Sequence, residues 1–153
     1  MITKQELHHI ASKRKLKDLA FMEKDYALTW VLKAIYTNPI LAQILVFKGG
    51  TCISKVYAEN YRLSEDLDFT LAKNKTISIE LLTNELNRSF ESVQLEGGPE
   101  LRVKSSGNVE NKGYLSVRIR YVGPLAHPGD IKVEISLGEA ILYQVENHPI
   151  KEN

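Results

Sequence analysis

The chain has 153 residues, of which 43% are apolar and 25% are charged, and its formal net charge is +1. This composition fits one soluble globular domain with its own core, and it excludes a general attraction to nucleic acid or anionic membranes. The single cysteine, Cys52, excludes an internal disulfide bond and fits a reducing compartment. Because the N-terminus is not a signal peptide and no apolar run could span a bilayer, we expect a cytoplasmic protein without membrane contact.

The first part of the chain is predicted to be helical. Thr3 and Glu6 have the spacing of a capping box ahead of a short helix. A longer helix is expected from residue 16 or 17 to Tyr36, where Asn38-Pro39 ends it. Its apolar residues recur at helical spacing: Leu28, Val31, Leu32 and Ile35.

The middle of the chain alternates between strands and helices. A short apolar stretch leads through Val46 and Phe47 to two glycines, and a helix is expected from Thr51 to about Tyr57 or Tyr61. A strand from Asp66 to Leu71 and a helix from Ile79 to Phe90 follow. The apolar residues expected to face the core are Ile53, Val56 and Tyr57 in the first helix, Leu67, Phe69 and Leu71 in the strand, and Leu81, Leu82, Leu86 and Phe90 in the second helix.

After Phe90 the apolar period changes to two, which is typical of strands. Strands are expected at residues 93–95, 101–104, 114–122 and 130–137, with turns that contain glycine or proline between them. This order predicts an α+β fold with a mixed or mostly antiparallel sheet, covered by helices on one side.

Two aspartates near the head of the predicted 66–71 strand are candidate metal ligands. Asp66 and Asp68 are two residues apart, so their side chains point to the same face, and Leu67 and Phe69 face the core. Two ionised carboxylates repel each other, and Mg²⁺ would remove that cost. The alternative is a solvated strand edge with two exposed acids.

The glycine turn is a candidate phosphate site. Gly49 and Gly50 lie between a short strand and a helix, where the backbone could approach a phosphate closely. The alternative is a tight turn in which Thr51 serves as the helix N-cap.

Glu134 is an acid on the polar face of an otherwise apolar strand. It shares that face with Lys132 and Ser136, whereas Val133 and Ile135 point the other way. Glu134 therefore suits a third metal ligand beside the two aspartates. The alternative is an exposed strand acid paired with Lys132 or an arginine.

These segments together resemble the DNA polymerase β-type nucleotidyltransferases. A glycine turn, an Asp-x-Asp strand and a later acid on a central strand are the layout of that superfamily. The sequence segment KGGTCISKVY, followed by RLSEDLDF, is similar to the corresponding segments of the AbiEii/AbiGii abortive-infection toxin family within that superfamily. Glu23 to Tyr26 and Lys132 to Ile135 also match, so the resemblance covers about residues 23–137. Its most specific part runs from Arg62 to Phe69.

The resemblance implies a polymerase β-like fold and a nucleotidyltransferase reaction. Asp66, Asp68 and Glu134 would hold two Mg²⁺ ions and move a nucleoside monophosphate from an NTP to an acceptor hydroxyl, with release of pyrophosphate. The phosphates would be held by Gly49, Gly50 and Thr51, their charge would be neutralised by Lys48, Lys55 or Arg62, and Ser64 would donate a hydrogen bond. The presence of a lysine at position 55 is explained equally well by its helix propensity and by solvation of its side chain.

The family also implies a toxin role beside an antitoxin, with RNA, such as tRNA, as the acceptor. Arg118, Arg120 and Lys132 are candidate contacts to the acceptor or the phosphates, and the two arginines fit cross-strand salt bridges slightly better. The basic cluster of residues 13–17 either binds an RNA backbone or forms a solvated helix face. The four histidines show no zinc-ligand spacing.

Domain organisation follows from the same resemblance. We expect one nucleotidyltransferase-like domain over residues 1–143, with N-terminal helices at 1–38 and the catalytic core at 45–137, and a flexible tail over 144–153. The family implies a longer, mostly helical second half that completes the active site. We therefore expect a truncated or compact member, and the alternative function is binding of a nucleotide or a partner protein without catalysis. Phosphoryl transfer and an unrelated α+β interaction domain are further alternatives.

Overall fold

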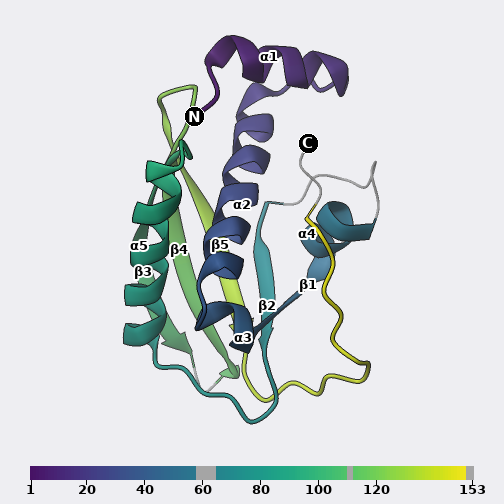
Figure 1. The fold of residues 1–153 in the computed structure, drawn as a ribbon, viewed down its shortest axis with the longest axis vertical. Coiled ribbons are helices and arrows are strands. Elements are labelled where there is room, and N and C mark those ends of the chain that lie inside the picture. Colours follow the sequence, from purple (N-terminus) through teal and green to yellow (C-terminus); the bar gives the residue numbers. More distant parts are fainter. Residues whose placement is uncertain (58–64, 110–111, 151–153) are drawn as a thin grey trace.

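The computed structural model describes residues 1–57, 65–109 and 112–150 (Figure 1). For residues 108 and 109 it describes the backbone but not the side chains. Its helices are α1 (Lys4–Lys13), α2 (Leu19–Thr37), α3 (Leu41–Ile44), α4 (Gly49–Cys52), the π-helix η1 (Ile53–Tyr57) and α5 (Ile79–Leu95). Its strands are β1 (Leu45–Lys48), β2 (Leu67–Leu71), β3 (Glu100–Val109), β4 (Tyr114–Val122) and β5 (Pro128–Ser136). The α+β class predicted from the sequence is confirmed.

The described strands form one five-stranded sheet in the order β1-β2-β5-β4-β3. Only the β2–β5 pair is parallel in this sheet, and its other neighbours are antiparallel. The sheet is therefore mixed and mostly antiparallel, as expected. The parallel pair joins segments far apart in sequence, and it carries both Asp68 and Glu134.

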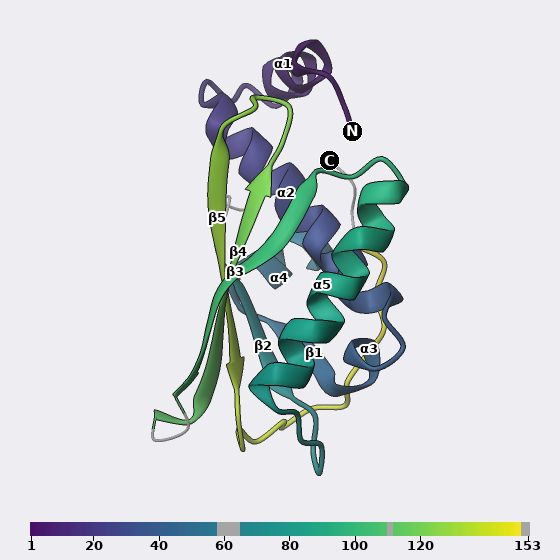
Figure 2. The same cartoon turned by 90° about the vertical axis from the view of Figure 1, so that its left-hand side faces the viewer.

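Helices α2 and α5 lie on one side of the sheet, and neither of them covers its other face, which we call the uncovered face (Figure 2). The core between the two layers is continuous. It combines Leu28, Val31, Leu32 and Ile35 of α2 with Leu82, Leu86 and Phe90 of α5 and with alternate residues of the strands, such as Phe69, Val133 and Ile135. The polar residues between these apolar strand positions therefore face the uncovered side.

The two N-terminal helices begin at side-chain caps. Thr3 and Glu6 form the predicted capping box of α1, and Leu7 and Ala11 pack from α1 against Met22 of α2. The α2 helix begins later than expected because the Asp18 carboxylate accepts hydrogen bonds from the next residues' backbone N–H groups.

The helix α5 extends further than the sequence pattern indicates. The predicted strand at residues 93–95 is wrong, because Val93 continues the buried helical stripe of Leu82, Leu86 and Phe90. Leu81 was expected in the core but is 41% exposed. The next strand, β3, is longer than predicted and contains a register irregularity between Val103 and Ser105.

The C-terminal segment leaves β5 and returns along β1 and η1 (Figure 1). Ile150 packs against the core, and His148 forms an edge-on ring contact with Tyr57. The flexibility expected for residues 144–153 stays a prediction, and 151–153 lie outside the described residues. Within the part of the chain that the structure describes, no helix combines the length and apolarity needed to cross a bilayer.

Candidate active site

Asp66 and Asp68 lie at the start of β2, on its uncovered face. The strand begins at Leu67, so Asp66 precedes it by one residue and is exposed, whereas Asp68 is half-buried. Leu67 and Phe69 are completely buried on the core face. The alternation of the strand thus separates the carboxylates from the core, as the sequence indicates.

Glu134 lies beside Asp68 on the neighbouring strand. The two residues are register partners in the parallel β2–β5 pair. The pKa of Asp68 is raised, first by burial and then by the negative charges of Glu134 and Asp66, while Lys48 and Lys132 act in the opposite direction. The three acids therefore share one electrostatic environment.

Lys132 competes for the Glu134 carboxylate. Its Nζ lies 2.7 Å from Glu134 Oε1, and this contact raises the pKa of Lys132. Among residues 1–57, 65–109 and 112–150, no three His, Cys, Asp or Glu side chains converge closely enough to form a metal-ligand cluster. The carboxylates are thus neighbours on one face, but in this conformation they are not gathered around a common point.

The glycine turn lies directly against Asp68. Gly49 has a φ of +80°, and a Cβ at this position would lie 2.8 Å from Asp68 Oδ2. The residue must therefore be glycine both for its backbone conformation and for its closeness to the carboxylate. The glycines belong to α4, and the expectation that the helix begins at Thr51 is wrong.

Thr51 connects this turn to β2. Its Oγ1 donates a 2.5 Å hydrogen bond to the backbone carbonyl of Asp66, and its side chain is buried. The N-cap position of α4 is Lys48, which makes no side-chain capping bond, so the N-cap interpretation of Thr51 is wrong. Thr51 instead fixes the turn relative to the Asp-x-Asp segment.

Lys55 is not brought to the carboxylates. It is 1% exposed, and its Nζ lies 2.8 Å from Asp25 Oδ1 and 2.9 Å from Thr29 Oγ1 of α2. Solvation therefore does not explain this lysine. The other two predicted phosphate contacts, Arg62 and Ser64, lie outside the described residues.

Two of the predicted acceptor contacts, Arg118 and Arg120, lie on the uncovered face of β4, one strand beyond Glu134. Arg120 forms a cross-strand ion pair with Asp130, with 3.0 Å between Nε and Oδ1, as the salt-bridge interpretation expects. Arg118 is exposed and is the register partner of Lys132. Arg14 of the N-terminal basic cluster is directed inward to Asp25, at 3.4 Å.

Thr70 and Glu139 lie next to this site and were missed, whereas the strand pattern already indicated that Ser136 shares the face of Glu134. Thr70 follows Asp68 by two positions, so strand alternation alone could have placed it on the same face. Glu139 follows the end of β5, and no sequence pattern indicates where its side chain lies.

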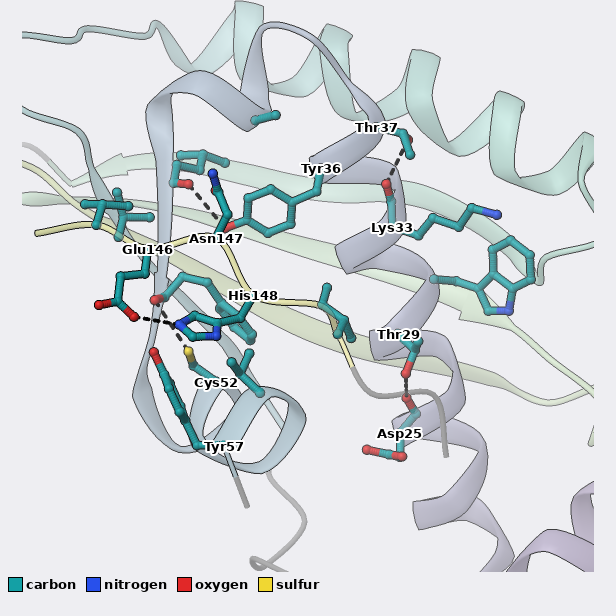
Figure 3. Close-up of a pocket in the computed structure, with 18 of the residues that line it drawn as sticks. Asp25, Thr29, Lys33, Tyr36, Thr37, Cys52, Tyr57, Glu146, Asn147 and His148 are labelled. Atoms are coloured by element: carbon teal, nitrogen blue, oxygen red, sulfur yellow. Dashed lines mark hydrogen bonds and ion pairs between the residues drawn. The ribbon is translucent and has the colours of Figure 1, made fainter. Parts of the chain in front are cut away.

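A large cavity lies elsewhere, on the α2 side of the α4–η1 segment (Figure 3). It has a volume of about 1220 Å³ and is lined by α2, β1, η1 and the C-terminal segment. Tyr36, Cys52, Tyr57 and His148 line it, but Asp66, Asp68 and Glu134 do not. Its lining is largely apolar and aromatic, so this cavity does not locate the predicted chemistry.

Comparison with known families decides the wider assignment. The family model described as "Nucleotidyl transferase AbiEii toxin, Type IV TA system" matches residues 30–153. The chain belongs to the AbiEii family. No curated protein matches it. The match to the AbiEii family includes the glycine turn, both aspartates and Glu134, so the candidate active site lies within the region that defines membership.

Membership assigns a nucleotidyltransferase-type domain from a toxin–antitoxin system. The AbiEii match begins within α2, and it includes the whole sheet. The family resemblance seen in the sequence is thereby confirmed.

Proposed function

We propose that this chain is a Mg²⁺-dependent nucleotidyltransferase that moves a nucleoside monophosphate from an NTP to a hydroxyl of an RNA acceptor, such as tRNA, as a toxin neutralised by an antitoxin. One observation carries the proposal. Asp68 is in contact range of a glycine turn and is paired in register with Glu134, on a sheet face that neither α2 nor α5 covers.

The donor chemistry at this site fits Mg²⁺. Mg²⁺ takes one or two carboxylates and completes its shell with water and substrate phosphate oxygens, so it does not require a closed cage of protein ligands. Burial and the charges of Glu134 and Asp66 disfavour the ionised form of Asp68, and a cation would relieve that cost. Asp66 and Asp68 would hold the metal, and Glu134 would join them on leaving Lys132.

Bound Mg²⁺ supplies charge neutralisation for the triphosphate and activation of the acceptor hydroxyl. The chain supplies the positioning. The backbone at Gly49 and Gly50 can approach phosphates closely, and the Lys48 ammonium is near enough to Asp68 to affect its pKa. Thr51 fixes the turn relative to Asp66 through its hydrogen bond to the backbone carbonyl.

The test is transfer of label from each α-labelled NTP to total tRNA in the presence of Mg²⁺. We expect transfer by the wild-type chain and a loss of about 10²- to 10³-fold in Asp68→Asn and Asp66→Asn, the size expected for removal of one preorganised electrostatic group. Glu96→Gln is the matched control, because this half-exposed acid pairs with Lys33, away from the carboxylates. Product mass distinguishes nucleotidyl from phosphoryl transfer. Label transfer that persists in both aspartate variants would contradict the proposal.

Metal binding has its own readout. Mg²⁺ should raise the thermal midpoint of the wild-type chain and have little effect on Asp68→Asn, because a ligand that binds only the folded state stabilises it. An equal shift in both proteins would show that Asp68 does not hold the ion.

A second candidate function is nucleotide binding without turnover. The ion pair between Lys132 and Glu134 favours it, because it engages the third carboxylate, and the described acids do not form a ligand cluster. This function predicts Mg-NTP binding by calorimetry with neither label transfer nor pyrophosphate release. Release of pyrophosphate at a rate that Asp68→Asn abolishes would exclude it.

A further inference from the structure

Donors from β1 and β2 converge on the carboxylate of Glu139. Lys48 Nζ forms an ion pair with Glu139 Oε2, and Thr70 Oγ1 donates a hydrogen bond of 2.5 Å to the same oxygen. Lys48 Nζ also donates to Ser136 Oγ over 2.8 Å. These contacts hold the pKa of Glu139 below its ordinary range, with the largest contribution from Lys48, then Thr70. Glu139 is therefore an anion held by a lysine and hydroxyl groups.

This cluster adjoins the candidate carboxylates on the same sheet face. Lys48 is the register partner of Asp68, and Thr70 is the register partner of Ser136. Because side chains alternate along a strand, Thr70 lies one step beyond Asp68 on the same face. The donors that hold Glu139 thus border the carboxylates directly.

The donors and the acid are held differently. Thr70 is only 4% exposed and belongs to a strand in the interior of the sheet, so its hydroxyl has a fixed position. The Glu139 side chain is 48% exposed and lies on the segment that follows β5. An acid on such a segment can leave at low cost, whereas the donors stay in place.

A carboxylate and a phosphate offer the same kind of acceptor. Both present negatively charged oxygens to ammonium and hydroxyl donors, and charge-assisted hydrogen bonds are strong for both. Displacement of Glu139 by a phosphate would therefore keep the bonds of Lys48 and Thr70 satisfied.

We propose that Lys48, Thr70 and Ser136 form a phosphate subsite beside Asp68, that Glu139 fills it in this conformation, and that a phosphate of the substrate displaces Glu139. Assignment of that phosphate to an NTP depends on the proposed function. The subsite itself requires only that a polyphosphate anion compete with Glu139, so inorganic pyrophosphate is a sufficient probe.

The experiment is calorimetric titration of the full chain with inorganic pyrophosphate and Mg²⁺. If Glu139 fills the subsite about nine-tenths of the time, Glu139→Gln should bind pyrophosphate about tenfold more tightly than wild type. Glu139→Ala should give at least the same gain, because it removes the side-chain acceptor altogether, whereas glutamine keeps a neutral amide oxygen that holds the donors more weakly. Glu146→Gln is the matched control, since this exposed acid on the same segment pairs only with His148 among the described residues, and we expect its affinity to equal that of wild type.

Variants of the donors complete the test. Addition of Thr70→Val or Lys48→Met to Glu139→Gln should cancel the gain, with thermal melting to verify that each protein is folded. Unchanged or weaker binding by both Glu139 variants would overturn the subsite, even if the wild-type chain transfers nucleotides. Tighter binding that depends on Thr70 would support the subsite, even if no transfer is observed and the proposed function fails.

Discussion

Two groups of charged side chains point to opposite sides of the short segment formed by α4 and η1. They differ in how their charges are combined and in how deeply they are buried. On the α2 side, Lys55 is paired with Asp25, and both residues are at most 3% exposed. On the sheet side, Asp66, Asp68 and Glu134 are like charges with access to solvent. The first group combines opposite charges, and the second combines charges that repel.

The difference fits a structural role for the first group and the proposed metal-binding role for the second. A buried lysine is tolerated only when its charge is compensated, and Lys55 has Asp25 and Thr29 as partners. Burial nevertheless lowers its pKa more than Asp25 restores it. Like charges on an open face repel each other and reduce the stability of the fold. Such repulsion is typical of a site that binds a cation.

The largest effect is expected from removal of the buried lysine. Lys55→Met should destabilise the fold by about 3 kcal/mol, because it leaves the Asp25 carboxylate buried without its main partner. Arg14, 3.4 Å from Asp25, should limit the loss. Denaturant unfolding provides the measurement. Lys24→Met is the control, since its pair with Glu65 is partly exposed and should contribute less than about 1 kcal/mol. Equal losses in the two variants would contradict the buried-pair interpretation.

The glycine turn provides the next test, because it joins the two groups. Gly49→Ala should cost about 1–2 kcal/mol through its positive φ. Its added methyl group would also displace the Asp68 carboxylate, so transfer activity should fall further than stability alone explains. Gly113→Ala is the matched control, because Gly113 has a φ of +76° and the atom nearest to the new Cβ would be Leu137 O, at 4.0 Å. Equal activity in the two alanine variants would show that contact with Asp68 is unimportant.

Much of the architecture could be predicted because local rules decide it. The capping box at Thr3 and Glu6, the end of α2 near Asn38 and the bounds of β4 all follow from nearby residues. Strand alternation also separated Asp68 from the core residues Leu67 and Phe69. These features depend on short-range periodicity, which one sequence contains.

The contacts across the fold could not be predicted in this way. The helix after the glycines was expected to bury Ile53 and Tyr57, yet these are 41% and 62% exposed, while Thr51 and Lys55 are buried. The π-helical turn changes which residues share a face, and the partner that compensates Lys55 lies 30 residues earlier. The position of Glu139 likewise depends on where Lys48 and Thr70 lie in the folded sheet.

A surface pair of opposite charges should show a smaller effect than the buried pair. Hydrogen bonds from Arg120 and Lys104 lower the pKa of Asp130 to about 2. Because the folded-state pKa is depressed, this contribution is present above the ordinary value of 3.8 and is lost as the pH falls through about 2. Asp130→Asn should therefore cost less than about 1 kcal/mol at neutral pH and almost nothing at pH 2. A loss that is independent of pH would show that the pairing is not its cause.

The smallest effect should come from Asp68, but its sign separates the two groups most sharply. Burial and like charges raise the folded-state pKa of Asp68 above 3.8, so the folded chain holds this proton more tightly than the unfolded chain. Ionisation of Asp68 therefore reduces the free energy of unfolding as the pH rises from 3.8 through the higher folded-state pKa. Asp68→Asn cannot ionise, so we expect a gain in stability relative to wild type at neutral pH that disappears below pH 3.8.

Urea unfolding of both proteins at neutral and acidic pH, with and without Mg²⁺, measures this gain. Mg²⁺ at neutral pH should stabilise the wild-type chain and shrink its deficit relative to Asp68→Asn, since a bound cation compensates the repulsion that the substitution removes. Glu96→Gln should show neither response, because Glu96 already pairs with Lys33. A loss of stability in Asp68→Asn at neutral pH would place Asp68 with the compensated charges, and the carboxylate face would then resemble the Lys55–Asp25 group.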